Sequence, residues 1–401
     1  MSRNLPEGWQ SGKFGAFITL QRGFDLPVQH RKPGTFHVVA SNGRIDTHME
    51  PKVAGPAVVT GRSGTLGKVF YLADGCWPLN TTLYVKDFHG NDPKFVAWFL
   101  THFQLERFGT GTGVPTLNRN VVHDVDVIFP PLHEQRRIAE ILSSVDDAIA
   151  ATRAVIEQTR KVKQGVLERL LTKGIGHTRF KQTEIGEIPE GWEVVRVEDI
   201  AASIDSGWSP DCEKVPAREG EWGILKTSAV VWEGYQPYEN KSLPSYLKER
   251  PELQVKAGDV LVTRAGPVER TGVVALVRST PQKLMLSDKI IRIRSKTHLC
   301  APGFLALWLS SSRAQSEIIR KKSGMAQSQT NISQKALREL YIPLPPLEEQ
   351  EHIVTTVQTL EESFHAQDTE LRALIENKSA LMSDLLTGRK RVTDALPMAA
   401  E

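Results

Sequence analysis

The glycine-rich turn at residues 61–69, GRSGTLGKV, holds the side chains of this 401-residue chain that are best placed for chemistry. The backbone N–H groups of such a turn can cradle phosphates, and a lysine can reach them. A nucleotide-binding phosphate loop, however, needs glycine where Arg62 stands and Ser or Thr where Val69 stands. A nucleophile elbow around Ser63 would need a further glycine. The turn therefore indicates neither nucleotide hydrolysis nor acyl transfer.

Cations and hydroxyls are what this turn does offer, in Arg62, Ser63, Thr65 and Lys68. They suit phosphate oxygens, and arginine can also read guanine edges. A second glycine turn repeats the set with Arg264, Arg270 and Thr271, and nearby amides and hydroxyls could contact bases: Asn80, Thr81, Thr82, Ser328, Gln329 and Asn331. We predict that these residues bind DNA, although surface hairpins of the same composition are common.

No catalytic centre is evident in the sequence. Pro210, Asp211, Glu239 and Lys241 imitate the residue set of metal-dependent nucleases, but so loose a pattern arises by chance in most long sequences. No pair of Cys or His residues has the spacing of metal ligands. We therefore expect a noncatalytic protein with no metal or cofactor of its own.

Composition indicates an ordinary globular protein, since 40% of the residues are apolar and 24% are charged. The three cysteines are scattered, which suits a reducing cytoplasm, and the longest apolar run is far too short to span a bilayer. Net charge is +3 for residues 1–133, +2 for 134–173, +3 for 174–348 and −5 for 349–401. The two basic blocks suggest anionic partners, and the opposite charges of the other two segments suggest mutual attraction.

The sequence contains an internal duplication. LPEGW (5–9) returns as IPEGW (188–192), GRSG (61–64) as TRAG (263–266), and FVAWFL (95–100) as FLALWL (304–309). PPLHEQ (130–135) and PPLEEQ (345–350) lie 215 residues apart, as do the two LLT segments at 170–172 and 385–387. The earlier offsets of 183, 202 and 209 differ, as loop insertions in diverged domains would produce. The constant final offset requires an element that tolerates no insertion.

That element is predicted to be a long helix in each copy. Steps of four and three residues define a coiled-coil seam. Its apolar members are Ile138, Leu142, Val145, Ile149, Ile156, Val166 and Leu170 in the first copy, and Ile353, Val357, Leu360, Phe364, Leu371, Leu374, Leu381 and Leu385 in the second. Polar positions also correspond, since Thr152 matches Gln367 and Lys163 matches Lys378. About 40 residues make a rod of about 60 Å. The simplest partner for each stripe is the other helix, running antiparallel; two independent oligomerisation coils are the alternative.

Short β segments dominate the blocks. We expect strands at 57–60, 69–72, 82–85 and 125–129 in the first block and at 259–263, 272–277, 290–294 and 340–344 in the second, with an aromatic-faced helix near 95–103 and near 304–312. The predicted fold class is α+β: two α/β domains separated by two long antiparallel coiled-coil helices with pseudo-twofold symmetry.

These motifs resemble the DNA specificity subunits of type I restriction-modification systems, over nearly the whole chain. The resemblance is carried by PPLHEQRRIAEILSSVDDAI, by the segment from KQGVLERLLTKGIG to IPEGWEVV, and by QTNISQKALRELYIPLPPLEEQEHI; SNGRI, GRSGTLGKVFY and WPLNTTLYV are similar to target-recognition domains of that family. GVPTLN (113–118) departs from its counterpart SQTNIS (328–333), and the second glycine turn is longer. Base contacts inferred for one copy therefore transfer poorly to the other.

The resemblance implies target-recognition domains at 1–133 and, with a linker, 174–348, spacer helices at 134–173 and 349–389, and a tail at 390–401. Each domain would read half of a bipartite asymmetric site in double-stranded DNA. Two methylation subunits would dock on the helices and use S-adenosylmethionine; restriction subunits would use ATP and Mg²⁺. The spacer would act as a ruler, comparable to the ~34 Å turn of DNA. A tandem protein-binding scaffold and a self-contained endonuclease are the alternative functions.

Overall fold

The computed structural model describes residues 5–111, 113–326 and 329–392. The chain forms two compact units: unit 1 comprises Met1–Ile156 and Gln367–Glu401, and unit 2 comprises Glu157–Ala366. Each unit therefore contains one of the predicted blocks together with part of each long helix.

The core of unit 1 is a four-stranded antiparallel sheet in the order β2-β9-β6-β7, with a helix packed on β6 and β7. These elements are β2 (Thr19–Arg22), β6 (Ala57–Gly61), β7 (Val69–Leu72), β9 (Thr82–Asp87) and α2 (Pro93–Phe103). A second sheet has the order β4-β3-β8-β5. Its strands are β3 (Phe36–Ala40), β4 (Gly43–His48), β5 (Val53–Ala54) and β8 (Gly75–Pro78). The remaining elements are β1 (Gln10–Lys13) paired with β12 (Asp126–Phe129), β10 (Gly109–Thr110) paired with β11 (Thr116–Leu117), α1 (Phe14–Phe17) and α3 (Arg119–His123).

Unit 2 repeats this plan with a sheet in the order β16-β25-β21-β23. Its elements are β16 (Ala201–Ser206), β21 (Val260–Thr263), β23 (Val274–Leu276), β25 (Ile290–Ser295) and, packed on β23, α6 (Pro302–Ser310). The second sheet contains β20 (Asn240–Ser242), β17 (Gly223–Leu225) and β24 (Leu284–Met285). Smaller pairings join β13 (Phe180–Thr183) to β14 (Gly186–Pro189), β15 (Glu193–Arg196) to β28 (Tyr341–Leu344), β18 (Val230–Val231) to β19 (Gly234–Tyr235), and β22 (Ala265–Gly266) to β27 (Gln329–Asn331) to β26 (Ser323–Ala326). The short helices are α5 (Val197–Ile200), α7 (Ser312–Arg320) and α8 (Gln334–Arg338).

The duplication predicted from the motifs is confirmed strand by strand. β1 pairs with β12 in the register Gln10↔Phe129, and β15 pairs with β28 in the register Glu193↔Leu344. These pairs differ by the same 183 and 215 residues as the repeated motifs on either side of them. The helix expected at 304–312 is shorter than predicted, because α6 ends at Ser310. A new helix, α7, follows, and the Ser311 side chain caps its start by accepting a hydrogen bond from the Ala314 N–H.

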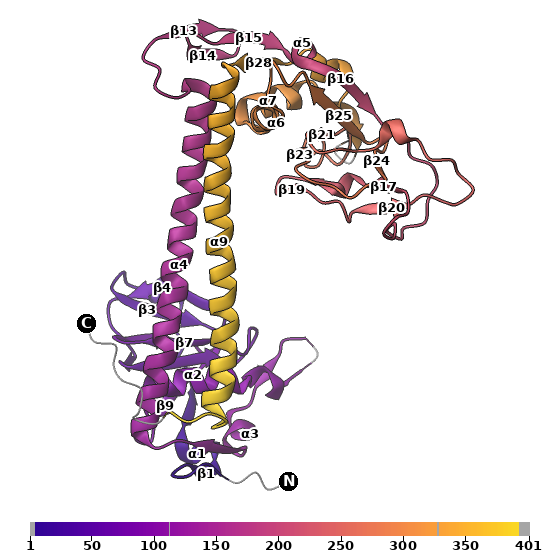
Figure 1. Ribbon diagram of the computed structural model, residues 1–401. Coiled ribbons are helices and arrows are strands. Elements are labelled where there is room, and N and C mark those ends of the chain that lie inside the picture. Colours follow the sequence, from indigo (N-terminus) through magenta and orange to yellow (C-terminus); the bar gives the residue numbers. More distant parts are fainter. Residues whose placement is uncertain (1–4, 112, 327–328, 393–401) are drawn as a thin grey trace. The chain divides into compact units, whose positions relative to one another are not determined.

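The two long helices are α4 (Leu132–Lys173) and α9 (Leu347–Leu386). In unit 1 the start of α4 packs against the end of α9, so that Ile138 and Leu142 share a core cluster with Leu385. In unit 2 the end of α4 shares a cluster with the start of α9 (Figure 1). The helices are therefore antiparallel in each unit, which confirms the predicted fold class. None of the helices in the described part of the chain is long and apolar enough to cross a membrane.

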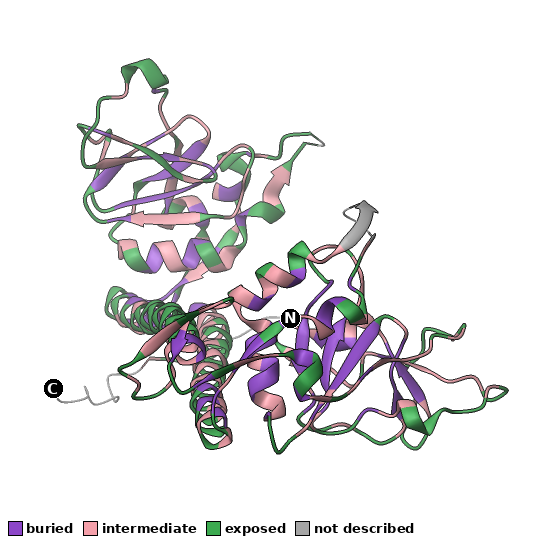
Figure 2. Cartoon of the chain, turned by 90° about the horizontal axis from the view of Figure 1, so that it is seen from above, coloured by how far each residue is buried: buried purple, intermediate pink, exposed green. Residues whose placement is uncertain are grey.

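All the predicted seam residues are buried or half-buried, and both exposed and less exposed residues are seen along the long helices (Figure 2). The nearby apolar residues Val155, Val162 and Ile375, which are off the seam, are exposed. Leu142 is 0% exposed because the other helix and the unit 1 domain cover it. The chain itself therefore covers the apolar seams. The alternative, two independent oligomerisation coils, would instead need a second molecule to cover each seam.

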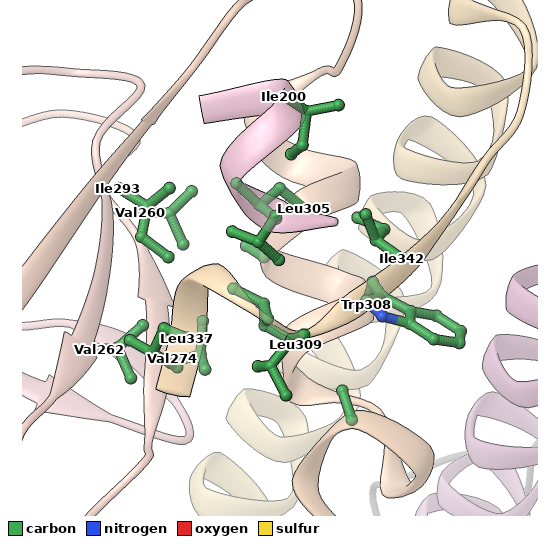
Figure 3. Close-up of a cluster of buried hydrophobic side chains, with 14 of the residues drawn as sticks. Ile200, Val260, Val262, Val274, Ile293, Leu305, Trp308, Leu309, Leu337 and Ile342 are labelled. Carbon is green, nitrogen blue, oxygen red and sulfur yellow. The ribbon is translucent and has the colours of Figure 1, made fainter. Parts of the chain in front are cut away.

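Helix α6 lies at the centre of the main core of unit 2 (Figure 3). Leu305 and Leu309 are fully buried among the strands of the sheet, α5 and α8. Trp308 is 2% exposed, and its indole N–H donates to the Tyr341 carbonyl oxygen at 3.0 Å. The core therefore ties the sheet directly to β28, the strand that leads into α9.

Candidate nucleic-acid interface

The glutamate of each PPL-x-EQ motif accepts a hydrogen bond from the tryptophan of the PEGW motif in the same unit. Trp9 Nε1 donates to Glu134 at 3.0 Å, and Trp192 Nε1 donates to Glu349 at 2.9 Å. Both indoles are buried, so each N–H needs such an acceptor. Arg391 also donates two hydrogen bonds of 2.9 Å to Glu134, and this contact raises the pKa of Arg391. Two motifs that lie more than 120 residues apart in the sequence are therefore one structural feature.

The glutamine of the same motif fixes the aromatic-faced helix. Gln135 Oε1 accepts from the Asp92 N–H at 2.9 Å, immediately before α2, and Gln350 Oε1 accepts from the Ala301 N–H at 2.8 Å, immediately before α6. Each glutamine also donates to the carbonyl oxygen five residues before it, at 2.9 and 2.8 Å. Both side chains are buried, 2% and 0% exposed. The repeated PPL-x-EQ segment thus joins a domain to the first turn of the long helix that follows it. In each unit we call the bonds of this glutamate and this glutamine a junction.

The end of the opposite helix completes each junction. Gly174 (φ +63°) ends α4 beside Trp192, and Gly388 (φ +68°) follows α9 beside Trp9. A Cβ atom would lie 2.7 Å from Trp192 at the first position and 3.2 Å from Trp9 at the second. A left-handed conformation and a close aromatic neighbour both require glycine here. Each tryptophan is therefore held between the start of one long helix and the end of the other.

Two ion pairs between the helices follow the same symmetry. Lys163 Nζ lies 3.0 Å from Glu361 in unit 2, and Lys378 pairs with Asp146 in unit 1. The members correspond across the offset of 215, because Lys163 matches Lys378 and Asp146 matches Glu361. The two lysines, which interrupt the seam, are thus accommodated by equivalent acidic partners.

The glycine turn of unit 1 connects β6 to β7 and lies between two other segments. Its Arg62 N–H donates to the Thr81 carbonyl oxygen at 2.8 Å, and the Arg62 carbonyl accepts from the Leu117 N–H at 2.8 Å. Lys68 Nζ reaches the carbonyl oxygen of Asn42 at 3.4 Å, at the tip of the β3–β4 hairpin. The structure therefore brings together Arg62, Ser63 and Lys68 with the Asn80 and Thr81 segment and with SNGRI.

The corresponding turn of unit 2 connects β21 to β23. The Arg264 carbonyl accepts from the Ile332 N–H at 2.9 Å, which matches the bond between Arg62 and Leu117 in unit 1. Asn331 pairs with Ala265 across β22 and β27, and Gln329 begins β27. The backbones of Arg264, Gln329 and Asn331 thus lie in neighbouring segments, and the correspondence of GVPTLN with SQTNIS holds in three dimensions. Ser328 lies outside the described residues.

Buried hydroxyls limit two of the predicted contacts. Thr82 is 0% exposed, and its hydroxyl donates to the Leu79 carbonyl oxygen at 2.7 Å. Thr271 is 2% exposed, and its hydroxyl hydrogen-bonds within the turn and with Thr330 at 2.9 Å. Both side chains stabilise their turns and expose little surface, and contact of Thr82 and Thr271 with DNA stays a prediction. Thr65 is half-buried in the turn of unit 1.

The residues that imitate a nuclease do not form a metal centre. Glu239 pairs with Lys226 at 3.3 Å and hydrogen-bonds Ser228, and the Ser228 bond, followed by the bond and charge of Lys226, lowers the pKa of the carboxyl. Among the described residues, no group of three or more His, Cys, Asp or Glu side chains could hold a metal ion. Burial raises the pKa of the Cys76 and Cys300 thiols to about 12, so neither is a ready nucleophile.

Sequence reasoning did not group four cations of unit 2, Lys226, Lys241, Arg270 and Lys289, which line a single hollow. Three of them lie on or beside the strands β17, β20 and β25, and the fourth lies in the β21–β23 turn. Only Arg270 was predicted to bind DNA. No spacing rule links positions in four separate segments, so the folded sheet alone reveals the group.

Comparison with known proteins identifies the family. The family model for the type I restriction modification DNA specificity domain matches residues 6–159 and again 189–377. The chain belongs to this family.

Curated members resemble the chain over different lengths. A segment of 173 residues, 43% of the chain, is 44% identical to the specificity subunit of the type I restriction enzyme EcoEI from Escherichia coli. A segment of 292 residues, 70% of the chain, is 31% identical to the MjaVIII specificity subunit from Methanocaldococcus jannaschii. These matches span 29% and 66% of the two relatives.

Solved structures share the fold of this type I specificity chain. The S subunit of a type I restriction-modification system from M. genitalium has a TM-score of 0.60, at 14% identity, with 98% of each chain covered. A chain from a structure of type I system assembly and conformational transition has a TM-score of 0.59, at 18% identity, covering 97% of this chain and 100% of that one. The repeated architecture is therefore the fold of known S subunits.

Proposed function

We propose that this chain is the noncatalytic DNA-recognition subunit of a cytoplasmic type I restriction-modification complex. Residues 1–133 and 174–348 act as target-recognition domains, each reading one half of a bipartite asymmetric site in double-stranded DNA. The segments 134–173 and 349–389 act as spacer helices that dock two methylation subunits, and restriction subunits join through the assembled methyltransferase. Partner subunits use S-adenosylmethionine, ATP and Mg²⁺.

One observation carries this proposal: the tryptophan and glutamine bonds of the two junctions correspond, whereas the glycine turns of the two units differ. Equivalent surfaces around equivalent helices suit two copies of one partner. Turns that differ in length and in cations suit two different half-sites. In unit 1 the turn presents Arg62, Ser63 and Lys68, and in unit 2 it presents Arg264 and Arg270 over a longer loop.

Arginine side chains on these turns, and amide side chains in the neighbouring segments, supply the kinds of donor that base readout requires. Arginine can donate two hydrogen bonds to guanine, and asparagine can do the same to adenine in the major groove. The lysines and serines around them suit phosphate oxygens, which fix the register on the duplex. Residue Arg62 is half-buried, and its guanidinium forms no ion pair within the described part of unit 1, so it is available to DNA.

Methylation mapping tests this function. The chain is expressed with a neighbouring methylation subunit in a host that lacks adenine methylation, and N6-methyladenine is located by sequencing. We expect one motif with two different half-sites and an unspecified gap, and no methylation when the chain is omitted. A contiguous motif, or the same methylation without the chain, would contradict the proposal; cleavage of DNA by the chain alone with Mg²⁺ would favour an endonuclease.

A further inference from the structure

A basic hollow of about 350 Å³ lies at the surface of unit 2, next to the second glycine turn. Its cations are Lys226, Lys241, Arg270 and Lys289, and Ser209, Ser228 and Ser287 also line it. We call this site the basic hollow. It belongs to the β17, β20 and β24 side of the unit, away from the part of α9 in the same unit (Figure 1).

The fold brings these cations together from separate segments. Lys241 lies in β20 opposite Ile224 of β17, and Lys226 follows β17 directly. Lys289 precedes β25, and its carbonyl oxygen accepts from the Arg264 N–H at 2.7 Å. The hollow is therefore attached by the backbone to the turn that we propose reads DNA.

Two of the four cations form ion pairs with neighbouring carboxylates. Lys226 pairs with Glu239 at 3.3 Å, and Lys289 pairs with Asp288 at 3.3 Å. Within the described residues, Lys241 and Arg270 have no ion pair. Two positive charges at one small hollow are thus not held in an ion pair, although the charge of Glu239 also acts on Arg270. Such a site attracts an anion, because like charges held together are stabilised by an opposite charge between them.

A hydroxyl group in the wall also lacks a partner. Ser287 is 4% exposed, and its Oγ has no hydrogen-bond partner in the described part of the chain. Its backbone is held in place, since the Ser287 carbonyl accepts from the Gly207 N–H at 3.0 Å. A buried hydroxyl without a partner destabilises the fold, so a ligand oxygen that accepted from it would recover part of that loss. Because Ser287 lines the hollow, rotation about its Cα–Cβ bond can present this donor to a ligand there.

We propose that the basic hollow binds a backbone phosphate of the DNA duplex, next to the bases read by the 264–271 turn. This inference rests on the proposed DNA-reading function and adds a positioning site to it. Lysine, arginine and hydroxyl groups are the side chains that contact phosphate oxygens, and no Asn or Gln side chain suited to a base edge lines the hollow. Lys241 and Arg270 bind the phosphate, and Ser287 donates to it.

The salt dependence of DNA binding tests this site. The full chain, assembled with its methylation subunits, is titrated by fluorescence anisotropy with a cognate and an unrelated duplex over a range of KCl concentrations. For Lys241→Gln with Arg270→Gln we expect affinity at low salt to fall at least tenfold for both duplexes. We also expect the slope of log affinity against log salt to flatten by about 0.9 for each phosphate that the variant no longer neutralises. Lys241→Arg keeps the charge and should keep the slope.

Arg179→Gln provides the matched control, because it removes an exposed cation of unit 2 that does not line the hollow. Its slope should equal that of the wild type. Unfolding curves identify any variant that does not fold, in which case Lys241→Gln alone is compared with Lys241→Arg. A wild-type slope in the folded neutral variants, or a changed methylation motif, would overturn the phosphate site. If the wild-type complex binds neither duplex in a salt-dependent way, the proposed function itself fails.

Discussion

The junctions and the glycine turns of this chain differ in how far the two units have diverged. At the junctions, Gln135 and Gln350 make corresponding bonds to the residue before an aromatic-faced helix, and Trp9 and Trp192 donate to corresponding glutamates. At the turns, the backbone bond made by the carbonyl of Arg62 or Arg264 is shared, but the loop length and the cations are not. The parts that hold a domain on the helices have been retained, and the parts that we propose face DNA have changed.

One difference at the junctions shows how much variation their geometry tolerates. Glu134 is 1% exposed and accepts two bonds from Arg391, whereas Glu349 is hydrogen-bonded to His177 at 2.9 Å. The second partner of the glutamate differs in size and shape, but the indole acceptor and the helix start stay in place. What the junction requires is therefore a fixed carboxylate for the tryptophan rather than one particular partner.

The largest effect is expected from a charge placed in the helix seam. Leu142→Asp puts a carboxylate at a position that is 0% exposed in the unit 1 core, so we expect unit 1 to lose more than about 4 kcal/mol. Because Leu142 is buried within its own chain, it is a core residue rather than a docking residue. Val155→Asp, at a position 50% exposed on the same helix, is the control. Chemical unfolding with hydrogen exchange measures both; equal stability of the two variants would refute the buried seam.

Removing either junction glutamine should have a smaller and nearly equal effect. Gln135→Ala and Gln350→Ala each leave a buried N–H and a buried carbonyl oxygen unpaired, which costs about 1–3 kcal/mol. Each decrease in stability should appear in the unit that contains the substitution. Urea unfolding followed by hydrogen exchange of each unit gives the two values. A decrease in one unit and none in the other would show that the junctions are not equivalent.

A change in the recognition turn should leave stability intact and weaken DNA binding. Arg62→Ala removes a half-buried guanidinium, and we expect binding to weaken by about 1–3 kcal/mol if the side chain contacts a base edge. Lys13→Ala removes a cation of β1 that pairs with Asp124 and Asp126, outside the glycine turn, and serves as the control. Titration of the cognate duplex at matched salt compares them. Identical isotherms for Arg62→Ala and the wild type would remove Arg62 from the interface.

The smallest effects are expected at the interhelical ion pairs. Lys163 and Glu361 are about one-third exposed, and the equivalent pair of Lys378 and Asp146 is also only partly covered. Double-mutant cycles with alanine should give couplings of about 0.2–1 kcal/mol for each pair. Similar coupling energies in the two units would support the equivalence of the two ion pairs, and coupling energies of opposite sign would contradict it.

The long helices and central strands of this molecule could be predicted from the sequence, because the spacing of apolar residues reflects which side chains are buried. The seam followed from spacing, and the strands around Val59 and Ile291 followed from β-branched runs. The tertiary contacts between distant segments could not be predicted. The bonds of Gln135 and Gln350 join motifs that are distant in the sequence, and the basic hollow collects its lysines from separate segments. Residue type alone also does not reveal that Thr82 and Thr271 are buried.

The central claim is that the helices set the distance between two different readers, and insertion into both helices tests it most directly. Four residues, about one helical turn, are added after Ala151 in α4 and after Ala366, the corresponding position of α9. Methylation is then mapped in a host expressing the chain with its methylation subunit. We predict that the gap between the half-sites lengthens while the half-sites keep their bases. Altered half-sites with an unchanged gap would contradict the account.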